Sequence, residues 1–284
     1  MDAEQAVDAS ISALADFDLI TTQEASASPP SHYLRDHRHE YVRTVRDILR
    51  TKPLQHGKIE ILEIGAFFGA VCMALSSLGY AVTAADIPEY IELPEQVERF
   101  KRYGIATKGV RLENFRLPFP DESFDVLIMC EVLEHLNFNP LPLIKEINRV
   151  LKPNGLFYLS LPNFARAKNR MLMLHGKAPG VTVDEFYTQL DPAGAMIANG
   201  HWREYTMAEV KELLLPMGFL IQEHYYFSAG ETKSGGSIRK RLGRWFYQNF
   251  PTLKENQTAL AIRAARTTRT FTIPPTVHKD IRLL

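Results

Sequence analysis

Cysteine is scarce in this chain of 284 residues: Cys72 and Cys130 are the two present, and both lie inside apolar runs. A disulfide framework is therefore not expected, and both thiols fit the interior of a protein in a reducing compartment. The chain also lacks an apolar run of the ~18 residues that cross a bilayer. It has no N-terminal stretch with the basic and then apolar layout of a secretory signal. We therefore expect a cytoplasmic protein without an integral membrane segment.

An excess of charge of either sign is also missing, because 33 Lys and Arg side chains balance 33 Asp and Glu side chains. This balance excludes a chain-wide attraction to nucleic acid, which depends on clustered Lys and Arg neutralising phosphates. The charge is nevertheless unevenly distributed. Residues 1–30 contain six acidic side chains and no Lys or Arg, which predicts a flexible acidic arm.

Basic residues gather near the other end of the chain. A helix is predicted over residues 237–249, where four basic residues stand beside Trp245, Phe246 and Tyr247. We expect its aromatic face to lie in the core and its basic face in solvent. Contact of this helix with an anionic substrate, a membrane surface or another subunit of a homo-oligomer stays open. Residues 266–284 are expected to form a C-terminal tail.

Short apolar strands alternate with amphipathic helices along the middle of the chain. Strands are predicted at residues 58–65, 80–86, 107–113, 124–130, 156–162, 219–227 and 258–265, and helices at residues 32–50, 70–79, 93–104, 141–152 and 206–218. This alternation predicts an α/β fold with a parallel sheet and helices on both faces. A leading helical segment at 31–57 precedes a domain at 58–265, and the irregular stretch at 163–203 predicts a lid or insertion.

The stretch EIGAFFG, residues 63–69, follows the first predicted strand. Ligands of open α/β sheets bind beyond the carboxyl ends of the strands, where this turn lies. The G-x-G-x-x-G fingerprint of dinucleotide sites is absent, since Phe67 replaces the glycine that lets the backbone approach a pyrophosphate. The phosphate-binding pattern G-x-x-x-x-G-K-[ST] is absent as well.

Asp86 ends the second predicted strand, 21 positions after Gly65. A carboxylate at this place can accept hydrogen bonds from both hydroxyl groups of a ribose. The glycine turn and the carboxylate together therefore favour a ligand that has a nucleoside but no phosphate.

Four motifs follow one another between residues 58 and 227: ILEIGAFFG, VTAAD, LPFPDESFDVLIMCEVLEHL and INRVLKPNGLFYLSLPN. In this order they resemble the class I S-adenosylmethionine-dependent methyltransferases. The resemblance implies a Rossmann-like, mostly parallel sheet with an antiparallel last strand, and S-adenosyl-L-methionine (SAM) as the cofactor. The first loop of that family has the form E-x-G-x-G-x-G, so Phe67 replaces the middle glycine, a departure that the family tolerates.

The resemblance implies that the first loop and the second strand end hold most of the cofactor. The loop residues that would lie against its methionine part are Glu63, Gly65, Ala66, Phe67 and Gly69. Asp86 would hold the ribose, and Ile87 would pack on the adenine.

Three further groups of cofactor contacts come from elsewhere in the chain. Glu113 or Asn114 would stand near the adenine amino group, where the family usually has Asp. The residues that would border the sulfonium at the end of the fourth strand are Cys130, Glu131 and Val132. On the leading helix, Tyr33 and Arg38 either close the pocket or lie at the surface.

Methyl transfer to a hydroxyl requires alignment of the acceptor and removal of its proton. CEVLEHL places Glu134 and His135 just past a strand end, beside the expected methyl group. We predict His135 as the general base and Glu134 as its orienting partner or rival; a packed or capping histidine is the alternative. His201, which follows the predicted lid, is the second candidate.

The residues predicted to contact the substrate supply hydrogen bonds, stacking and anion binding: Asn163, Trp202, Arg203 and Tyr205. A turn residue at 163 and an anchored lid at 202–205 are the alternatives. A histidine cluster on the leading helix does not share one helical face, so we predict no metal ion. That cluster consists of His32, His37 and His39.

The sequence therefore predicts SAM-dependent methylation of a small-molecule or sugar-like acceptor. HWREYTMAEVKELLLPMGF resembles methyltransferases of glycan and secondary-metabolite pathways, which favours O-methylation. Carbon or nitrogen methylation of a quinone-like metabolite stays open. The rival from another class is a non-catalytic binding module with this fold, which Phe67 and Glu113 favour.

Overall fold

A seven-stranded sheet forms the centre of the protein. The computed structural model describes residues 1–14, 30–54, 57–183, 200–228, 245–268 and 270. The strands are β1 (Glu60–Ile64), β2 (Ala81–Asp86), β3 (Ala106–Gly109), β4 (Phe124–Cys130), β5 (Leu151–Pro162), β6 (Phe219–Phe227) and β7 (Asn256–Arg263). Their order is β3-β2-β1-β4-β5-β7-β6, and β7 is antiparallel to both neighbours. The predicted α/β fold with an antiparallel last strand is confirmed.

The central strands β1 and β4 mark the place where a ligand can bind. β1 pairs in parallel with β2 on one side and with β4 on the other. The chain order of the strands reverses here, and the carboxyl ends of all three strands meet at one edge. Open α/β sheets bind ligands at such a switch point.

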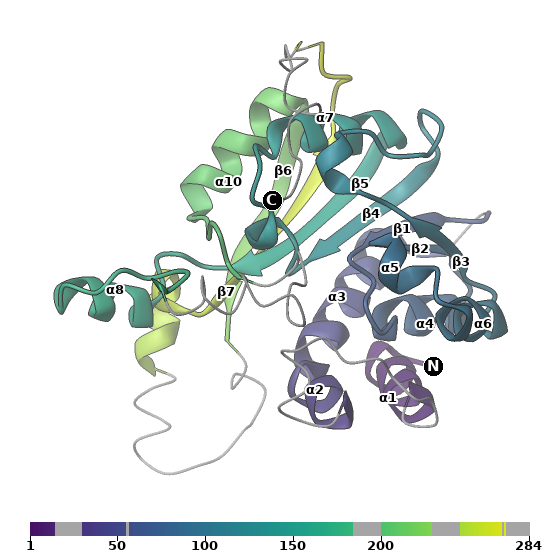
Figure 1. Ribbon diagram of the computed structural model, residues 1–284, viewed down its shortest axis with the longest axis horizontal. Coiled ribbons are helices and arrows are strands. Elements are labelled where there is room, and N and C mark those ends of the chain that lie inside the picture. Colours follow the sequence, from purple (N-terminus) through teal and green to yellow (C-terminus); the bar gives the residue numbers. More distant parts are fainter. Residues whose placement is uncertain (15–29, 55–56, 184–199, 229–244, 269, 271–284) are drawn as a thin grey trace, which may run out of the picture.

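Helices cover both faces of the sheet. The α-helices along the described chain are α1 (Ala3–Leu14), α2 (Pro30–Asp36), α3 (Arg38–Thr51), α4 (Ala70–Ser77), α5 (Pro88–Ile91), α6 (Pro94–Arg102), α7 (Leu141–Val150), α8 (Ala167–Leu174) and α10 (Met207–Leu214). Successive residues of β1 face different cores: Ile61 packs in the cluster that includes α1, α3 and α4, and Leu62 in the cluster that includes α7 and α10. Figure 1 shows these two groups of helices on opposite sides of the sheet.

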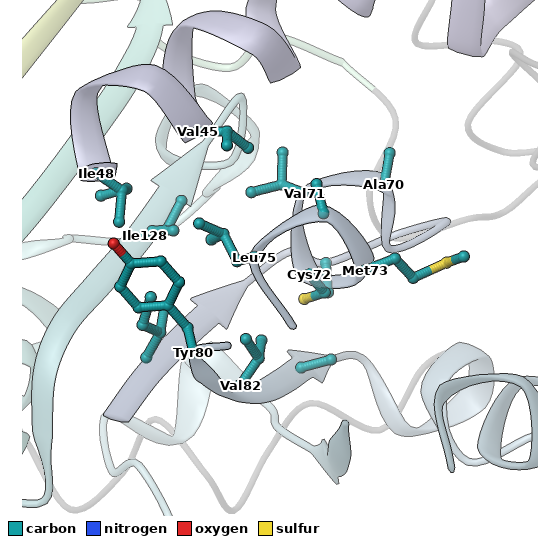
Figure 2. Packing of buried hydrophobic residues seen from close by; sticks show 14 of the residues in the cluster. Val45, Ile48, Ala70, Val71, Cys72, Met73, Leu75, Tyr80, Val82 and Ile128 are labelled. Carbon is teal, nitrogen blue, oxygen red and sulfur yellow. The ribbon is translucent and has the colours of Figure 1, made fainter. Parts of the chain in front are cut away.

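The leading helical segment is packed tightly against the sheet. Figure 2 shows Val45 and Ile48 of α3 near Leu75 of α4 and Ile128 of β4. All four side chains are completely buried. Burial of each such side chain stabilises the fold by about 1.5–3 kcal/mol. Since α3 buries its side chains in the same cluster as α4 and β4, it belongs to the core of the domain that follows it.

The first residues form a helix, so the flexible arm predicted for residues 1–30 is wrong for α1. Val7 is completely buried in the core cluster that also contains α3 and α4. The acidic side chains face outward and form ion pairs, as Asp8 does with Arg38 of α3 (Nη2–Oδ2 2.8 Å). Buried residues recur every three to four positions in α1, and this pattern favours a packed amphipathic helix despite the excess of negative charge.

Parts of several predicted segments lie outside the described residues. They are residues 15–29 of the N-terminal arm, 184–199 of the lid, 237–244 of the basic helix, and 269 and 271–284 of the tail. The first part of the predicted lid contains helix α8. In the part of the chain that the structure describes, no helix has the length and apolar character needed to cross a membrane.

The aromatic face of the predicted basic helix does not lie in the core. Residues 245–249 are helical, but Trp245 is 60% exposed and Phe246 is 40% exposed. Figure 1 shows this short helix near α8, away from the helices that cover the sheet. The prediction of a buried aromatic face is therefore wrong, because the rings contact one another instead, as Phe246 and Phe250 do at 5.1 Å between centroids.

His224 of β6 provides a test of stability against pH. Its Nε2 lies 3.0 Å from Oε1 of Gln257, and burial lowers its pKa from 6.5 to about 4. In the unfolded chain His224 binds a proton below about pH 6.5, whereas in the folded protein it does so only below about pH 4. The free energy of unfolding therefore decreases as the pH falls from about 6.5 to about 4. After a discount for partial exposure, the loss is on the order of 1 kcal/mol.

Urea unfolding of the wild type and His224→Gln at about pH 7 and pH 5 checks this expectation. The free energy of unfolding should fall less between the two pH values in the variant. Equal falls in both proteins would contradict the low pKa of His224.

Candidate functional site

The first loop is held against the end of β2 by its backbone. The N–H groups of Gly65 and Ala66 both donate to the carbonyl of Ala85, at 2.9 and 3.2 Å. Gly65 has φ +75°, and a Cβ added there would lie 2.3 Å from Cγ2 of Val132. Glycine is required at this position because the end of β4 packs directly onto the turn.

Phe67 has a left-handed backbone, the conformation for which glycine is the usual residue. Its φ is +45°, a conformation that non-glycine residues seldom adopt. Its N–H donates to Oδ2 of Asp86 at 2.8 Å. The phenylalanine therefore keeps the backbone geometry of the loop despite its side chain.

Asp86 is positioned by two backbone donors. Besides the bond from Phe67, its Oδ1 accepts the N–H of Ile87 at 2.8 Å. Burial raises the pKa of this carboxyl group, and the two N–H donors act in the opposite direction. A carboxylate has about four lone-pair sites, so each oxygen keeps an acceptor site for a hydroxyl. Two such free acceptor sites are what the predicted contact with both hydroxyl groups of a ribose requires.

The ring of Phe67 belongs to an aromatic group beside the loop. Its centroid lies 3.8 Å from that of Phe68 and 5.5 Å from those of Tyr33 and Tyr90. Tyr33 of α2 thus contacts the side chain of a loop residue. Arg38 instead forms a bidentate ion pair with Asp8 of α1, and this pair joins the N-terminal helix α1 to α3.

Replacing Phe67 by glycine separates the role of its ring from that of its backbone. Glycine relieves the positive φ but removes the contacts with three aromatic rings, so we expect a net loss of about 1–2 kcal/mol of stability. The N–H bond to Asp86 needs no side chain, so the dissociation constant for SAM should stay within about three-fold. Thermal unfolding and calorimetry measure both, and a ten-fold weaker affinity would place the ring inside the cofactor pocket.

Two predicted cofactor contacts differ from expectation. Glu63 lies beneath the loop, where its carboxyl group accepts a hydrogen bond from Cys72 Sγ at 2.7 Å and burial raises its pKa to about 7. Strand β3 ends at Gly109, four residues earlier than predicted, because a 3-10 turn follows over Leu112–Asn114. Glu113 and Asn114 are therefore exposed on that turn rather than aligned at the end of a strand.

The end of β4 carries a strained acidic residue. Glu131 has φ +52°, and its N–H donates to the carbonyl of Ser160 at 2.9 Å. Cys130 before it lies 3.8 Å from Thr44 Oγ1 of α3, and Val132 after it packs on Gly65. This short segment joins the first loop to the residues that follow β4.

Glu134 is the most enclosed carboxyl group of the site. It lies on a 3-10 turn, Leu133–His135, and is 0% exposed. No donor from the described residues reaches either of its oxygens. Burial raises the pKa of both Glu134 and Glu131, and for Glu131 the neighbouring charge of Glu134 raises it further.

Two histidines meet beside Glu134. The rings of His135 and His201 lie 4.8 Å apart at 89°, and Nε2 of His135 is 4.0 Å from Oε1 of Glu134. The backbone N–H of Arg203 donates to the carbonyl of Glu134, which fixes the segment of His201 against the turn. The structure thus brings together all three predicted catalytic residues.

Glu204 is a residue of this site that the sequence prediction missed. Its Oε1 lies 3.1 Å from Nδ1 of His201 and accepts a hydrogen bond from Arg166 at 2.7 Å, and Asn169 donates to Oε2 at 2.9 Å. The hydrogen bond to Glu204 raises the pKa of His201. The spacing of three residues between His201 and Glu204 was a signal in the sequence, whereas the contacts from α8 were not.

A cavity of about 220 Å³ opens next to His201. The residues that line it are Phe164, Pro179, Gly180, His201, Trp202, Arg203, Glu204 and Glu209. Two of the predicted substrate contacts, Trp202 and Arg203, therefore border a space that can hold a small molecule.

The other two predicted substrate contacts are corrected by the structure. Asn163 is 0% exposed, and its amide donates to the carbonyls of Thr252 and Lys254 at 2.9 and 2.8 Å. Its Oδ1 accepts the N–H of Ala165, so the side chain holds loops together. Tyr205 is 3% exposed and packs in the core with α7 and α10.

The part of the chain that carries these features matches known proteins. Residues 62–159, from β1 to β5, match the family described as "Methyltransferase domain". A probable S-adenosylmethionine-dependent methyltransferase of Mycolicibacterium smegmatis is 30% identical over 171 residues, which are 58% of this chain and 56% of that protein. The chain thus spans little more than half the length of this relative.

Two further proteins are similar over larger fractions of their length. A ubiquinone biosynthesis O-methyltransferase of Haemophilus ducreyi is 28% identical over 193 residues, 65% of this chain and 76% of that protein. A solved SAM-dependent methyltransferase of Methanosarcina mazei superposes with a TM-score of 0.51 at 24% identity, over 73% of this chain and 93% of the other, which shows a shared fold. From these matches and the sheet order, we conclude that residues 62–159 belong to the family of methyltransferase domains and that the chain has the fold of a solved SAM-dependent methyltransferase.

Proposed function

We propose that this protein transfers the methyl group of SAM to a hydroxyl group of a small-molecule or sugar-like acceptor. The observation that carries the proposal is a continuous series of contacts across the site. The glycine loop touches Val132, the turn after Val132 carries Glu134 and His135, and His135 meets His201 at the wall of the cavity. A cofactor on the loop and an acceptor in the cavity would have these side chains beside them.

The reaction needs a hydroxyl oxygen that attacks the methyl carbon in line with the departing sulfur. The oxygen uses an electron pair to form the new O–C bond, the S–C bond breaks, and its electron pair stays on the sulfur. The hydroxyl proton must be lost, so groups that lower its pKa or accept it speed the reaction. The cluster of Glu134, His135 and His201 supplies such groups, whereas alignment comes from the loop and the cavity walls.

The relatives support a small acceptor. The Haemophilus ducreyi protein is named as a ubiquinone biosynthesis O-methyltransferase, so a quinol or phenol is a reasonable acceptor class beside sugars. In this proposal the reacting ring of such a molecule enters the cavity of about 220 Å³ beside His201.

Two measurements in sequence test the proposal. Calorimetry with SAM and with its demethylated product comes first, and the absence of binding for both at high micromolar concentration would favour a non-catalytic module. Transfer of a tritiated methyl group to panels of sugars, phenols and quinols then identifies the acceptor. Mass spectrometry of the product determines whether oxygen, nitrogen or carbon carries the methyl group, and a methylated carbon or nitrogen would overturn the proposed chemistry.

A further inference from the structure

We propose that Glu134, His135 and His201 bind a divalent transition-metal ion beside the cavity. One ligand atom from each of these side chains lies within 4.8 Å of the others. Two come from the turn after β4 and one from the segment before α10, so the tertiary structure alone joins them. The sequence had predicted no metal ion, since the histidines on the leading helix point in different directions.

The first argument is the state of Glu134. Its side chain is completely buried, and in the described part of the chain neither oxygen receives a hydrogen bond from a donor. The neighbouring group is the half-buried carboxyl group of Glu131, whose Oε1 likewise has no partner among the described residues. A buried carboxylate without a donor or a cation is unfavourable by several kcal/mol. A bound cation would supply the missing positive charge.

The second argument is the orientation of His201. Its Nδ1 lies 3.1 Å from the carboxylate of Glu204, so the N–H is assigned to Nδ1 and the lone pair to Nε2. Glu204 is itself fixed by Arg166 and Asn169 of the segment around α8. Carboxylate-bound histidines of this kind are typical of metal sites, where the carboxylate sets the tautomer and makes the imidazole a better ligand.

His135 has the same arrangement with a different partner. Its Nδ1 lies 3.2 Å from the carbonyl of Gly200, which can only accept, so Nδ1 is the donor. Its Nε2 faces Glu134 at 4.0 Å. That separation is too long for a hydrogen bond but close to the ~3–4 Å between two ligands that share an ion at ~2.1 Å. Small side-chain adjustments would complete the coordination.

The ligand types determine the class of ion. Two imidazoles and one carboxylate suit Zn²⁺, Fe²⁺, Co²⁺ or Mn²⁺, whereas Mg²⁺ prefers an all-oxygen set. Three protein ligands leave at least one coordination position open, as in catalytic rather than structural sites. His201 also lines the cavity, so that open position borders the space where an acceptor would lie.

The role of the ion rests on the proposed methyl transfer. A hydroxyl bound to a divalent cation has a lowered pKa, so it releases its proton to water near neutral pH. The resulting oxygen anion would form the O–C bond as the S–C bond breaks and the electron pair stays on sulfur. The histidines then act by holding the ion rather than by accepting the proton directly.

Metal binding itself is tested without SAM or an acceptor. The full chain, free of a histidine tag and cleared of metal by a chelator, is titrated with Co²⁺, and Zn²⁺ is then used to displace it. We expect one saturable site with the visible absorption of a four- or five-coordinate Co²⁺ ion. No saturable binding up to about 100 μM free Co²⁺ or Zn²⁺ would overturn the proposal.

Variants show whether the ion occupies this cluster. Glu204→Gln should weaken Co²⁺ binding by ~10–100-fold, because it loses the carboxylate behind His201. His201→Ala and Glu134→Gln should weaken it more. Two matched controls on the surface, His175→Ala just after α8 and Glu98→Gln of α6, should bind as the wild type does. Unchanged binding in His201→Ala and Glu134→Gln, with normal circular dichroism, would overturn the assignment.

The two proposals fail in different ways. Binding of the ion by a protein that transfers no methyl group would leave the metal site in place and overturn the proposed function. Full methyl transfer by metal-free protein in excess chelator would leave the function in place and overturn the role of the ion. We expect transfer to fall at least ten-fold on removal of the ion and to return when Zn²⁺, Co²⁺ or Mn²⁺ is added.

Discussion

Replacing Asp86 by alanine is expected to weaken SAM binding by at least about 100-fold. Two hydrogen bonds from ribose hydroxyls to a charged acceptor would be lost, each worth about 1.5–3 kcal/mol, and about 1.4 kcal/mol corresponds to ten-fold. Asp86 also accepts the N–H groups of Phe67 and Ile87, so its removal loosens the loop as well. Calorimetric titration with SAM measures the effect.

Glu89 provides the control for this experiment. It lies three residues further on, at the exposed start of α5, where it pairs with Arg111. Glu89→Gln removes a carboxylate but leaves Asp86 and its two backbone donors in place, so the affinity of this variant for SAM should match that of the wild type. An Asp86→Ala variant that binds SAM as tightly as Glu89→Gln would show that the ribose is held elsewhere.

Replacing His135 by alanine is expected to lower kcat by about 100-fold or more and leave SAM affinity within two-fold. The reason is that His135 lies with Glu134 and His201 between the loop and the cavity, and not on the loop itself. Groups that help to remove a proton in the transition state typically contribute ~10²–10⁴ in rate. The acceptor found in the methyl-transfer screen provides the assay.

His175→Ala is the matched control, because His175 is exposed just after the last residue of α8 and its ring Nδ1 lies 2.7 Å from the carbonyl of Met171. Its kcat should equal that of the wild type. If His135→Ala also turned over at the wild-type rate, activation of the acceptor would need neither the imidazole nor an ion held by it, and alignment would account for catalysis.

Local sequence patterns were sufficient to predict the strands, most of the helices that cover the sheet, and the first loop. The apolar runs that became β1 and β4 are buried on both faces of the sheet, and such strands have a recognisable composition. Thr206 and Glu209 form a capping box at the start of α10, and both of its hydrogen bonds join residues three positions apart. Interactions between residues this close in the chain can be predicted from the local sequence.

Side chains whose partners are distant in the sequence were predicted less well. Arg38 was assigned to the cofactor pocket, but its ion pair with Asp8 spans 30 positions. Asn163 was assigned to the substrate, yet its amide joins carbonyls about 90 positions away. Neither sequence neighbourhood contains the partner, so composition and spacing had no information about it.

The sequence by itself determined the sheet, the glycine turn at Gly65 and the carboxylate at Asp86, because each depends on residues within one strand-turn-helix unit. Only the tertiary structure decided that His201 meets His135 and Glu134, and that Glu204, Arg166 and Asn169 stand behind it. The physical reason is that the described segment just before α10, residues 200–206, lies against the turn after β4, where the N–H of Arg203 donates to the carbonyl of Glu134. The course of this segment depends on packing and buried hydrogen bonds, and these bring a histidine to a carboxylate 67 positions earlier in the chain.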